Sequence, residues 1–311
     1  MLRIVSAAVV LFLIVPSTNG FAKPPIPLTD CETITHRGNY ILENDLVLPL
    51  IYSGGQGGNG NCLVISSSHV NVDLNGKTIT TSCIFPDGFP CEEVFVQGGI
   101  GIDIEADHVS IANGQIGAFD GGFVDGIVGE ANHISAANLK IVTDVGVVLN
   151  DVRYGAFTDI AYEGADMQHH AENGPAISVA GGGNNTFTST NSGSTTGIII
   201  ANSSNNTIDG SDISCSGFQE AGPGILLTQG SNNNFVTNNK VFVSFGNGIE
   251  VDLGSDDNVI QNNTVGTISP PGFFALFDQN SNCGSDIWTD NVFSNEGFLG
   301  QMSSNPAGCI H

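Results

Sequence analysis

The densest group of reactive side chains lies in the segment 161–174, AYEGADMQHHAENG. Its candidate binding residues are a phenol, three carboxylates and two imidazoles, namely Tyr162, Glu163, Asp166, His169, His170 and Glu172. Carboxylates could bind Ca²⁺ through oxygen, imidazoles could bind a transition metal, and both could transfer protons. Adjacent histidines on an extended chain point to opposite faces, however, so the two would not easily hold one ion. The segment is a candidate binding loop, with a polar surface insertion as the alternative.

Basic residues are scarce, which limits the choice of a proton acceptor or an anion-binding group. After Arg3 the sequence contains Lys23, Arg37, Lys77, Lys140, Arg153 and Lys240. Lys140 and Arg153 lie 13 residues apart, so they could share the flank of one coil with Asp144 and Asp151. These four are the candidate catalytic residues. The alternative is that each is a solvated surface group.

Three other histidines occur in similar settings, SSHV, ADHV and ANHI, at His69, His108 and His133. One interpretation is a column of metal ligands. The repeat position alone favours another, a corner ladder of neutral imidazoles in the position that asparagine takes later in the chain.

The elements that position these residues recur with a short period. Four similar segments, NTFTSTNS, NTIDGSDI, NFVTNNKV and NVIQNNTV, have starts separated by 21, 28 and 24 residues. Between them lie short alternating strands that begin with glycine, such as GIII, GILL and GIEV. A strand of this length cannot bury its inner face alone, so the copies must stack about 4.8 Å apart. The sequence therefore predicts a solenoid.

If these strands stack in register, their outward residues form a partly apolar stripe. The stripe contains Val128, Val148, Ile199 and Leu226, with Ser178 between them and Asp103 and Glu250 toward its ends. Such a stripe is either covered by loops or available to a partner.

The turns between strands are rich in Gly, Asn, Asp and Ser, which tolerate left-handed backbone or cap their own amides. Asn185, Asn206, Asn234 and Asn258 are predicted to stack as a hydrogen-bonded ladder at one corner. A second interpretation, N-glycosylation, applies to the sequons at Asn184, Asn202, Asn205 and Asn262. The predicted organisation is a signal peptide over 1–22, an N-terminal capping segment over 23–60, about nine coils over 61–295 and a C-terminal cap over 296–311.

Composition limits the possible cellular locations and the classes of binding partner. Arg3, the apolar run after it and Pro16 have the layout of a cleavable signal peptide, which predicts a secreted, extracellular or periplasmic protein with no membrane insertion of the mature form. The sequence has 31 acidic and 7 basic residues, a net charge of −24. Nucleic acid is therefore disfavoured as a partner, because binding it relies on Lys and Arg.

Seven cysteines in an exported chain suggest three disulfides and one free thiol. Spacing favours the pairs Cys31 with Cys62, Cys83 with Cys91, and Cys283 with Cys309. Cys215, inside a repeat, is then the free and buried one. Spacing alone leaves the pairing open, since six cysteines admit 15 arrangements.

Both ends of the chain resemble secreted bacterial right-handed parallel β-helix repeat proteins of the pectate-lyase-like superfamily. The opening element consists of Cys31, Ile34, Gly38, Tyr40, Leu42, Asp45, Leu46, Cys62, Val64, Ile65 and the segment VDLNGKTI. The closing element consists of Cys283, Trp288, Asn291, Phe293 and Cys309. The resemblance covers essentially the whole mature chain. It implies an all-β, right-handed parallel β-helix, and it says less about function because the group includes lyases, hydrolases, epimerases and members with no known activity.

The resemblance implies a protein that binds or processes a polysaccharide along the helix flank near residues 144–172. The alternative is a non-catalytic structural or adhesive surface solenoid. A lyase of this fold would use Lys or Arg as the base, often with Ca²⁺ held by acids, which points to Lys140 and Arg153. A hydrolase would use clustered aspartates, and Asp256 and Asp257 lack the accompanying Gly-His-Gly and Arg-x-Lys motifs. They are better explained as replacements for asparagine in the repeat.

Overall fold

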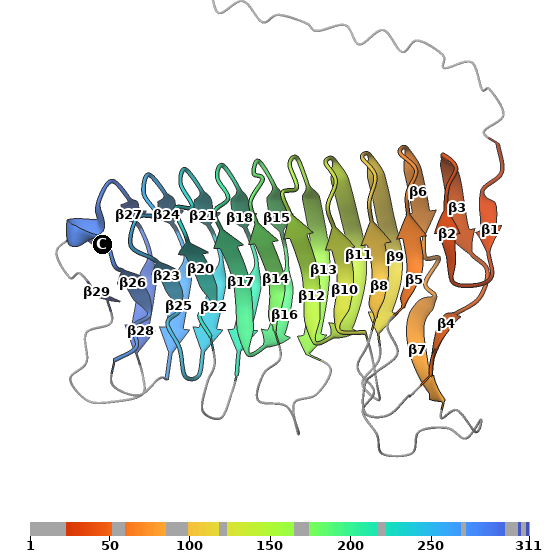
Figure 1. The fold of residues 1–311 in the computed structure, drawn as a ribbon. Coiled ribbons are helices and arrows are strands. Elements are labelled where there is room, and N and C mark those ends of the chain that lie inside the picture. The colour runs from red at the N-terminus through yellow and green to blue at the C-terminus, as the bar shows by residue number, and fades with distance from the viewer. Residues whose placement is uncertain are drawn as a thin grey trace, which may run out of the picture.

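Short strands wind around one axis and stack in parallel, as a β-helix requires (Figure 1). The computed structural model describes residues 23–51, 60–84, 99–117, 123–164, 174–216, 222–268, 272–295, 304–305 and 309–310. All pairings between its strands are parallel, and they form one sheet of 11 strands and one of 18. The predicted parallel β-helix is thereby confirmed. In the described part of the chain, no helix is long and apolar enough to cross a membrane.

Each full coil contributes one strand to the first sheet. Its members are β2 (Glu32–Ile34), β5 (Asn61–Ile65), β8 (Ile100–Ile104), β10 (Asp125–Gly129), β12 (Val145–Asn150), β14 (Pro175–Ala180), β17 (Thr196–Ala201), β20 (Ile225–Thr228), β23 (Ile249–Val251), β26 (Leu276–Asp278) and β29 (Ser304–Asn305). We call its outer face the eleven-strand wall. Eleven strands stack here where about nine coils were predicted, because β2 and β29 extend the sheet at its two ends.

The 18-stranded sheet bends around the rest of the coil, and the later coils supply two strands each. Its members are β1 (Ile26–Leu28), β3 (Gly38–Leu42), β4 (Leu46–Ile51), β6 (Val70–Asp73), β7 (Thr78–Ile84), β9 (Val109–Gly117), β11 (Ile134–Thr143), β13 (Ala156–Gly164), β15 (Thr186–Thr188), β16 (Asn191–Ser194), β18 (Thr207–Asp209), β19 (Asp212–Cys215), β21 (Phe235–Thr237), β22 (Lys240–Val243), β24 (Val259–Gln261), β25 (Thr264–Thr267), β27 (Ile287–Thr289) and β28 (Val292–Asn295). One short 3-10 helix, η1 (Ser281–Cys283), follows β26.

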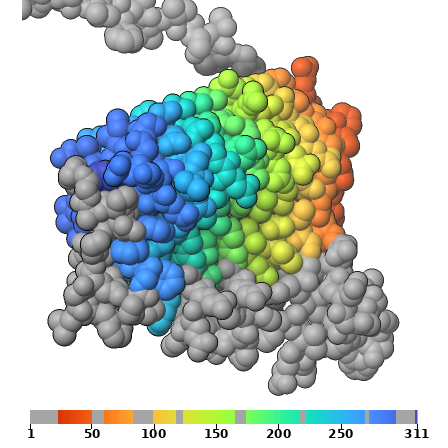
Figure 2. Space-filling view, turned by 60° about the vertical axis from the view of Figure 1, so that its left-hand side comes forward, coloured from red at the N-terminus to blue at the C-terminus, as the bar shows by residue number. Residues whose placement is uncertain are grey.

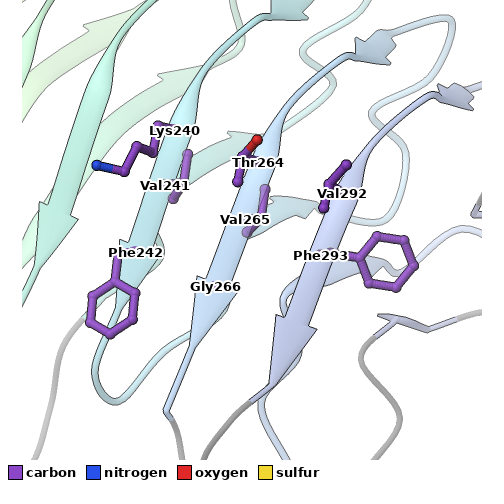
Figure 3. Close-up of a pocket in the computed structure, with 8 residues that line it drawn as sticks. All are labelled: Lys240, Val241, Phe242, Thr264, Val265, Gly266, Val292 and Phe293. Atoms are coloured by element: carbon purple, nitrogen blue, oxygen red, sulfur yellow. The ribbon is translucent and has the colours of Figure 1, made fainter.

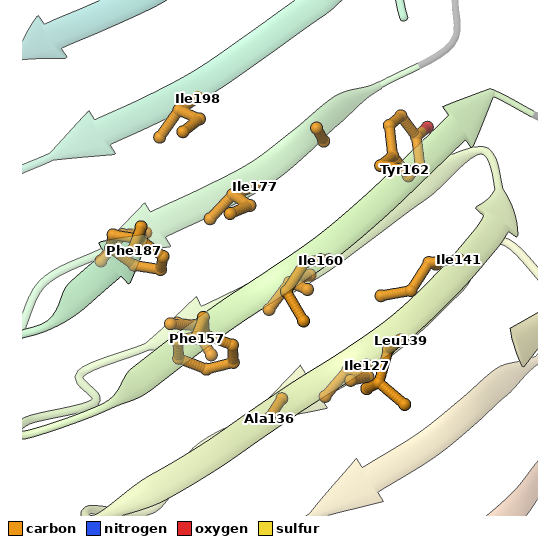
Figure 4. Close-up of a cluster of buried hydrophobic side chains, with 14 of the residues drawn as sticks. Ile127, Ala136, Leu139, Ile141, Phe157, Ile160, Tyr162, Ile177, Phe187 and Ile198 are labelled. Carbon is orange, nitrogen blue, oxygen red and sulfur yellow. The ribbon is translucent and has the colours of Figure 1, made fainter. Parts of the chain in front are cut away.

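The core is a stack of inward side chains, one layer per coil (Figure 4). Ile177 pairs with Ile198, Ile198 with Ile225, and Ile225 with Ile249, so the predicted strand copies lie on neighbouring rungs. All four side chains are fully buried. The rings of Phe157 and Phe187 stack in the same way, with centroids 5.4 Å apart. Stacking thus buries apolar surface that no single strand could bury alone.

The glycine that begins many strands of the eleven-strand wall is needed because the rungs approach closely. A Cβ on Gly197 would lie 2.0 Å from the carbonyl oxygen of Gly224, and one on Gly224 would lie 2.8 Å from that of Gly248. Both distances are below any normal van der Waals contact, so a side chain here would force the rungs apart.

The predicted asparagine ladder is present and fully buried. Asn185 Nδ2 donates to Asn206 Oδ1 at 3.1 Å, Asn206 to Asn234 at 2.9 Å and Asn234 to Asn258 at 3.1 Å. A second ladder, which the sequence analysis missed, runs through Asn239, Asn263 and Asn291 at the corner between the two strands of the larger sheet. Its members also repeat with the coil. The sequons Asn184, Asn202, Asn205 and Asn262 are exposed and belong to neither ladder.

Disulfides join segments at both ends of the solenoid. Cys31 is bonded to Cys62 and Cys283 to Cys309, while Cys215 is a buried free thiol, as predicted. The predicted pair of Cys83 and Cys91 lies outside the residues whose side chains are described, as does the predicted signal peptide. Strands β1 to β4, within the segment predicted as an N-terminal cap, pair with each other or with the next coil and so continue the solenoid.

Candidate functional site

The eleven-strand wall carries the predicted outward stripe as one continuous column. Register places Asp103 beside Val128, Val128 beside Val148, and Val148 beside Ser178. The column then continues through Ile199 and Leu226 to Glu250 and Phe277. Apart from Val128, which is buried, these side chains are partly exposed. The stripe is therefore apolar in the middle and acidic near each end.

At the N-terminal end of the wall, four acids lie on two neighbouring rungs. Asn61 Nδ2 donates to Asp103 Oδ2 at 2.6 Å. Burial raises the pKa of the Asp103 carboxyl, and the nearby charges of Glu105 and Glu130 raise that pKa further. Burial also raises the pKa of Asp125, which lies on the same sheet. These carboxyls can accept hydrogen bonds from ligand hydroxyl groups.

At the C-terminal end, amides already orient two carboxylates. Gln279 Nε2 donates to Glu250 Oε1 at 2.9 Å and to Asp252 Oδ1 at 2.8 Å. Asn247 Nδ2 donates to the other Glu250 oxygen at 2.8 Å, and Thr228 donates to Asp252. Three successive coils thus contribute to one polar group that no short sequence motif contains.

Several long connections lead in sequence from a strand of the larger sheet to the next strand of the smaller one. They separate β4 from β5, β7 from β8, β9 from β10, β13 from β14, β19 from β20 and β28 from β29. Connections on a rigid scaffold are where binding residues are usually found. The predicted loop at 161–174 is one of these connections.

Little of that predicted loop can be placed. Asp166, His169, His170 and Glu172 lie outside the described residues. Tyr162 is corrected from a ligand-binding residue to a core residue, because it is 1% exposed and its hydroxyl donates to the backbone oxygens of Thr143 and Asp144 at 3.0 and 2.6 Å. Burial raises its pKa well above the ordinary value, so the phenol stays neutral.

The four candidate catalytic residues are not brought together. Lys140 lies on β11, where its Nζ forms an ion pair with Glu163 Oε2 at 3.0 Å, and Asp144 precedes β12. Asp151 and Arg153 follow β12, at the next corner of the coil. A six-residue strand spans about 20 Å, so the expected shared flank is divided between two corners. Their catalytic role remains a prediction without a common site.

The three repeat histidines form the predicted ladder, and a tyrosine extends it. Ring centroids are 4.8 Å apart for His69 and His108, 4.5 Å for His108 and His133, and 5.0 Å for His133 and Tyr154. All four residues have φ near +60°. The column continues through Asn184, one residue before the buried ladder, so the histidines do not occupy the ladder position itself. In the described residues no three His, Cys, Asp or Glu side chains converge to hold a metal.

Asp256 and Asp257 also belong to the repeat. The backbone N–H of Asp256 donates to Asn232 Oδ1 at 2.7 Å, and Asp257 has the φ of +60° seen at Asn205 and Asn233. Asp257 therefore replaces an asparagine at the corner, which agrees with the structural interpretation.

A shallow pocket of about 190 Å³ lies on the outer face of β22, β25 and β28 (Figure 3). Thr264 and Gly266 form its floor, with Lys240 and Phe242 on one side and Val292 on the other. Lys240 Nζ already pairs with Asp212 Oδ2 at 3.2 Å. Figure 2 shows the later coils of the solenoid stacked in sequence order, without a deep cleft between them on this side. The wall is therefore the better candidate for an extended ligand.

Comparisons with known proteins agree with the fold. The family described as "Right handed beta helix region" matches residues 145–306. Pectate lyase Pel9A is 14% identical with a TM-score of 0.53, covering 85% of this chain and 72% of its own. The Dettilon tailspike protein (gp208) is 14% identical with a TM-score of 0.51, covering 89% of this chain, which spans 57% of the tailspike chain. No curated protein matches the sequence. At this identity the two structures establish the fold alone.

Proposed function

This chain belongs to the right-handed β-helix family, and we propose that it is an extracellular protein that binds a neutral polysaccharide along the eleven-strand wall. The observation that carries the proposal is the continuous outward column with oriented hydrogen-bonding groups near both ends. Secretion rests on the predicted signal peptide. One of the two similar structures is named a pectate lyase, an enzyme that acts on a polysaccharide, which is consistent with a polysaccharide ligand.

The spacing of the wall suits a polymer. Equivalent positions repeat at each rung, about 4.8 Å apart, so an extended polymer that lies along the column meets one outward side chain per rung. Apolar residues such as Ile199 and Leu226 can contact the carbon-bound faces of sugar rings. Carboxylates and amides at Asp103 and Glu250 can bind hydroxyl groups.

Charge favours a neutral polymer over a polyuronate. The strands of the eleven-strand wall contain acids at Glu32, Asp103, Asp125, Glu250 and Asp278 but no Lys or Arg. The whole chain carries a net charge of −24. The acids of the wall would repel a polyanion. A neutral polymer would meet no such repulsion and would only exchange its hydrogen bonds with water for hydrogen bonds with the wall.

A matched pair of variants tests the site. Ser178→Arg places a long charged side chain in the middle of the wall, between Val148 and Ile199. Thr186→Arg makes the same change at an exposed position of β15, on the other sheet. On a panel of neutral and acidic polysaccharides, the wild type and Thr186→Arg should bind a neutral polymer equally, and Ser178→Arg should bind at least about tenfold more weakly. Equal binding by all three proteins would place the ligand elsewhere.

The alternative is a non-catalytic adhesive or structural solenoid, favoured by the separation of Lys140 and Asp144 from Asp151 and Arg153. Incubation with bound polysaccharide, with and without Ca²⁺, separates processing from recognition. New reducing or unsaturated ends would establish processing. Binding without such ends would leave recognition, and no binding to any polymer would favour the structural alternative.

A further inference from the structure

An aromatic side chain lies in the outward column near the C-terminal end of the eleven-strand wall. Of the wall strands that the structure describes, only β26 contains an aromatic residue, Phe277. Register places Phe277 beside Glu250 of the preceding rung, so the ring continues the column. An aromatic ring has a flat, polarised face that the aliphatic side chains in the middle of the wall lack.

A second ring is stacked on the first. The ring centroids of Phe274 and Phe277 are 5.2 Å apart, and the ring planes differ by 23°. Both residues are partly exposed, whereas the stacked rings of Phe157 and Phe187 are fully buried in the core. The backbone N–H of Phe274 donates to Asn247 Oδ1 at 2.7 Å, which fixes the segment that carries the two rings. The pair is therefore held in place at the surface.

The same asparagine connects the rings to the polar group of the wall. Asn247 Nδ2 donates to Glu250 Oε2 at 2.8 Å, and Gln279 Nε2 donates to Glu250 Oε1 at 2.9 Å. Burial alternates along β26 and on to Gln279, which is exposed on the same side as Phe277. Each Glu250 oxygen thus has one orienting donor and keeps a lone pair that can accept a hydrogen bond from a ligand.

An aromatic ring beside an oriented carboxylate suits a sugar ring. The carbon-bound hydrogens of a sugar pack against an aromatic face, and the hydroxyl groups at its edge donate hydrogen bonds to a carboxylate. Hydrogen bonds to a charged acceptor are stronger than those between neutral groups. The sequence from 241 to 310 contains no Lys, Arg or His, so this segment supplies no cation for a uronate. These features favour a neutral sugar.

We propose that Phe277 and Glu250 form a binding site for one neutral sugar ring of the bound polymer, and that this site determines which sugar the wall accepts. The inference rests on the proposed function, because it assigns specificity to one end of the same wall. Phe277 and Glu250 contact the sugar, and Phe274 supports the ring of Phe277. Asn247 and Gln279 are positioning residues that orient the carboxylate.

Two substitutions at Phe277 test the role of the ring. Phe277→Leu keeps an apolar side chain without an aromatic face, and Phe277→Tyr keeps that face. Phe235→Leu is the matched control, because Phe235 is 47% exposed on β21 of the other sheet.

Calorimetric titration uses oligosaccharides of glucose, mannose, galactose and xylose, with oligomers of galacturonic acid and glucosamine for comparison. For the neutral oligosaccharide that the wild type binds most tightly, Phe277→Leu should bind at least about tenfold more weakly. Phe277→Tyr and Phe235→Leu should stay within about threefold of the wild type.

The results distinguish this inference from the proposed function. Equal binding by Phe277→Leu and Phe235→Leu, while Ser178→Arg binds more weakly, would overturn the inference and leave the proposed function intact. Failure of the wild type to bind any oligosaccharide or polymer would overturn both. Tighter binding of the galacturonic acid or glucosamine oligomer than of every neutral one would overturn the assignment of a neutral sugar.

Gln279→Ala covers the case in which Phe277→Leu does not fold, because Gln279 is exposed. Without its amide the Glu250 and Asp252 carboxylates lose their shared donor. This variant should keep the melting temperature of the wild type and bind the same oligosaccharide at least about threefold more weakly. Wild-type affinity in Gln279→Ala would then overturn the inference.

Discussion

Asparagine has two separate tasks at the corners of this protein. Asn184, Asn205 and Asn233 adopt φ near +60°, a conformation that most residues avoid. Each next residue, Asn185, Asn206 or Asn234, turns its side chain inward and joins the buried ladder. In the earlier coils histidine and tyrosine take the first position and stack on each other instead. Each of these corners thus requires a residue that can adopt a φ near +60°. Which residue type occurs there depends on the side chains of the neighbouring coils with which it stacks.

The ladder predicts a large effect for one amide. In Asn206→Ala the backbone N–H and Nδ2 of Asn185 lose their shared acceptor, and Asn234 Oδ1 loses a donor. Leaving such buried groups unpaired should lower the free energy of unfolding by about 3 kcal/mol. Urea unfolding followed by circular dichroism measures this. Asn191→Ala, at an exposed position of β16, should change stability by less than about 0.5 kcal/mol.

At the scale of the element, strands of three to six residues inside the solenoid persist because they are paired on both sides. β17 pairs with β14 and β20, and its inward residues Ile198 and Ile200 are fully buried. The close approach of neighbouring rungs leaves no room for a side chain at the glycine that begins the strand. An element of this kind is defined by its neighbours more than by its own propensity.

Substitution by alanine should therefore have different effects at two glycines that lie on strands consecutive in the sequence, β16 and β17. In Gly197→Ala the new methyl would lie 2.0 Å from the Gly224 oxygen and 2.7 Å from Ile213 Cγ2, so the rungs must separate. In Gly193→Ala the nearest atom is 3.9 Å away, and the backbone needs no positive φ. We expect the first variant to lose at least about 3 kcal/mol of stability and the second less than about 1 kcal/mol. Similar losses in both would contradict the close packing of the wall.

The whole molecule combines a neutral interior with a strongly negative exterior. Among the described residues, two ion pairs, Lys140–Glu163 and Lys240–Asp212, are formed by side chains at least 40% exposed. Such pairs contribute little to stability. Repulsion among the remaining acids is therefore only weakly offset, and the stacked core must outweigh it.

Salt and pH should consequently both change stability. At pH 8, raising NaCl from about 0.05 to about 0.5 M should raise the melting temperature, because salt screens repulsion between exposed charges.

Asp103, Asp125 and Asp286 have pKa values raised by burial, so the folded protein binds protons more tightly than the unfolded chain. The stabilising contribution of Asp286 is present in full below its ordinary pKa and is lost as the pH rises through about 7, and those of Asp103 and Asp125 are lost as the pH rises through their own raised pKa values. Thermal melts over both ranges test this, and a melting temperature that falls with salt would show that attraction outweighs repulsion.

The sequence by itself determined the solenoid, the order of its rungs and the first ladder. The period of the Gly-led strands and the asparagine segments repeats once per coil, and in a stacked structure residues one period apart must be neighbours. Ile198, Ile225 and Ile249 were placed on adjacent rungs for that reason. The two end disulfides are pairs that the spacing of the cysteines favoured, but spacing alone left the pairing open.

Only the tertiary structure decided which residues of different coils meet outside the repeat pattern. Lys140 and Arg153 lie 13 residues apart, within about one coil, yet β12 separates them. The group of Glu250, Asp252 and Gln279 depends on side-chain direction and on how each corner turns. A repeat fixes which rung a residue occupies, but the bend at each corner fixes what its side chain faces.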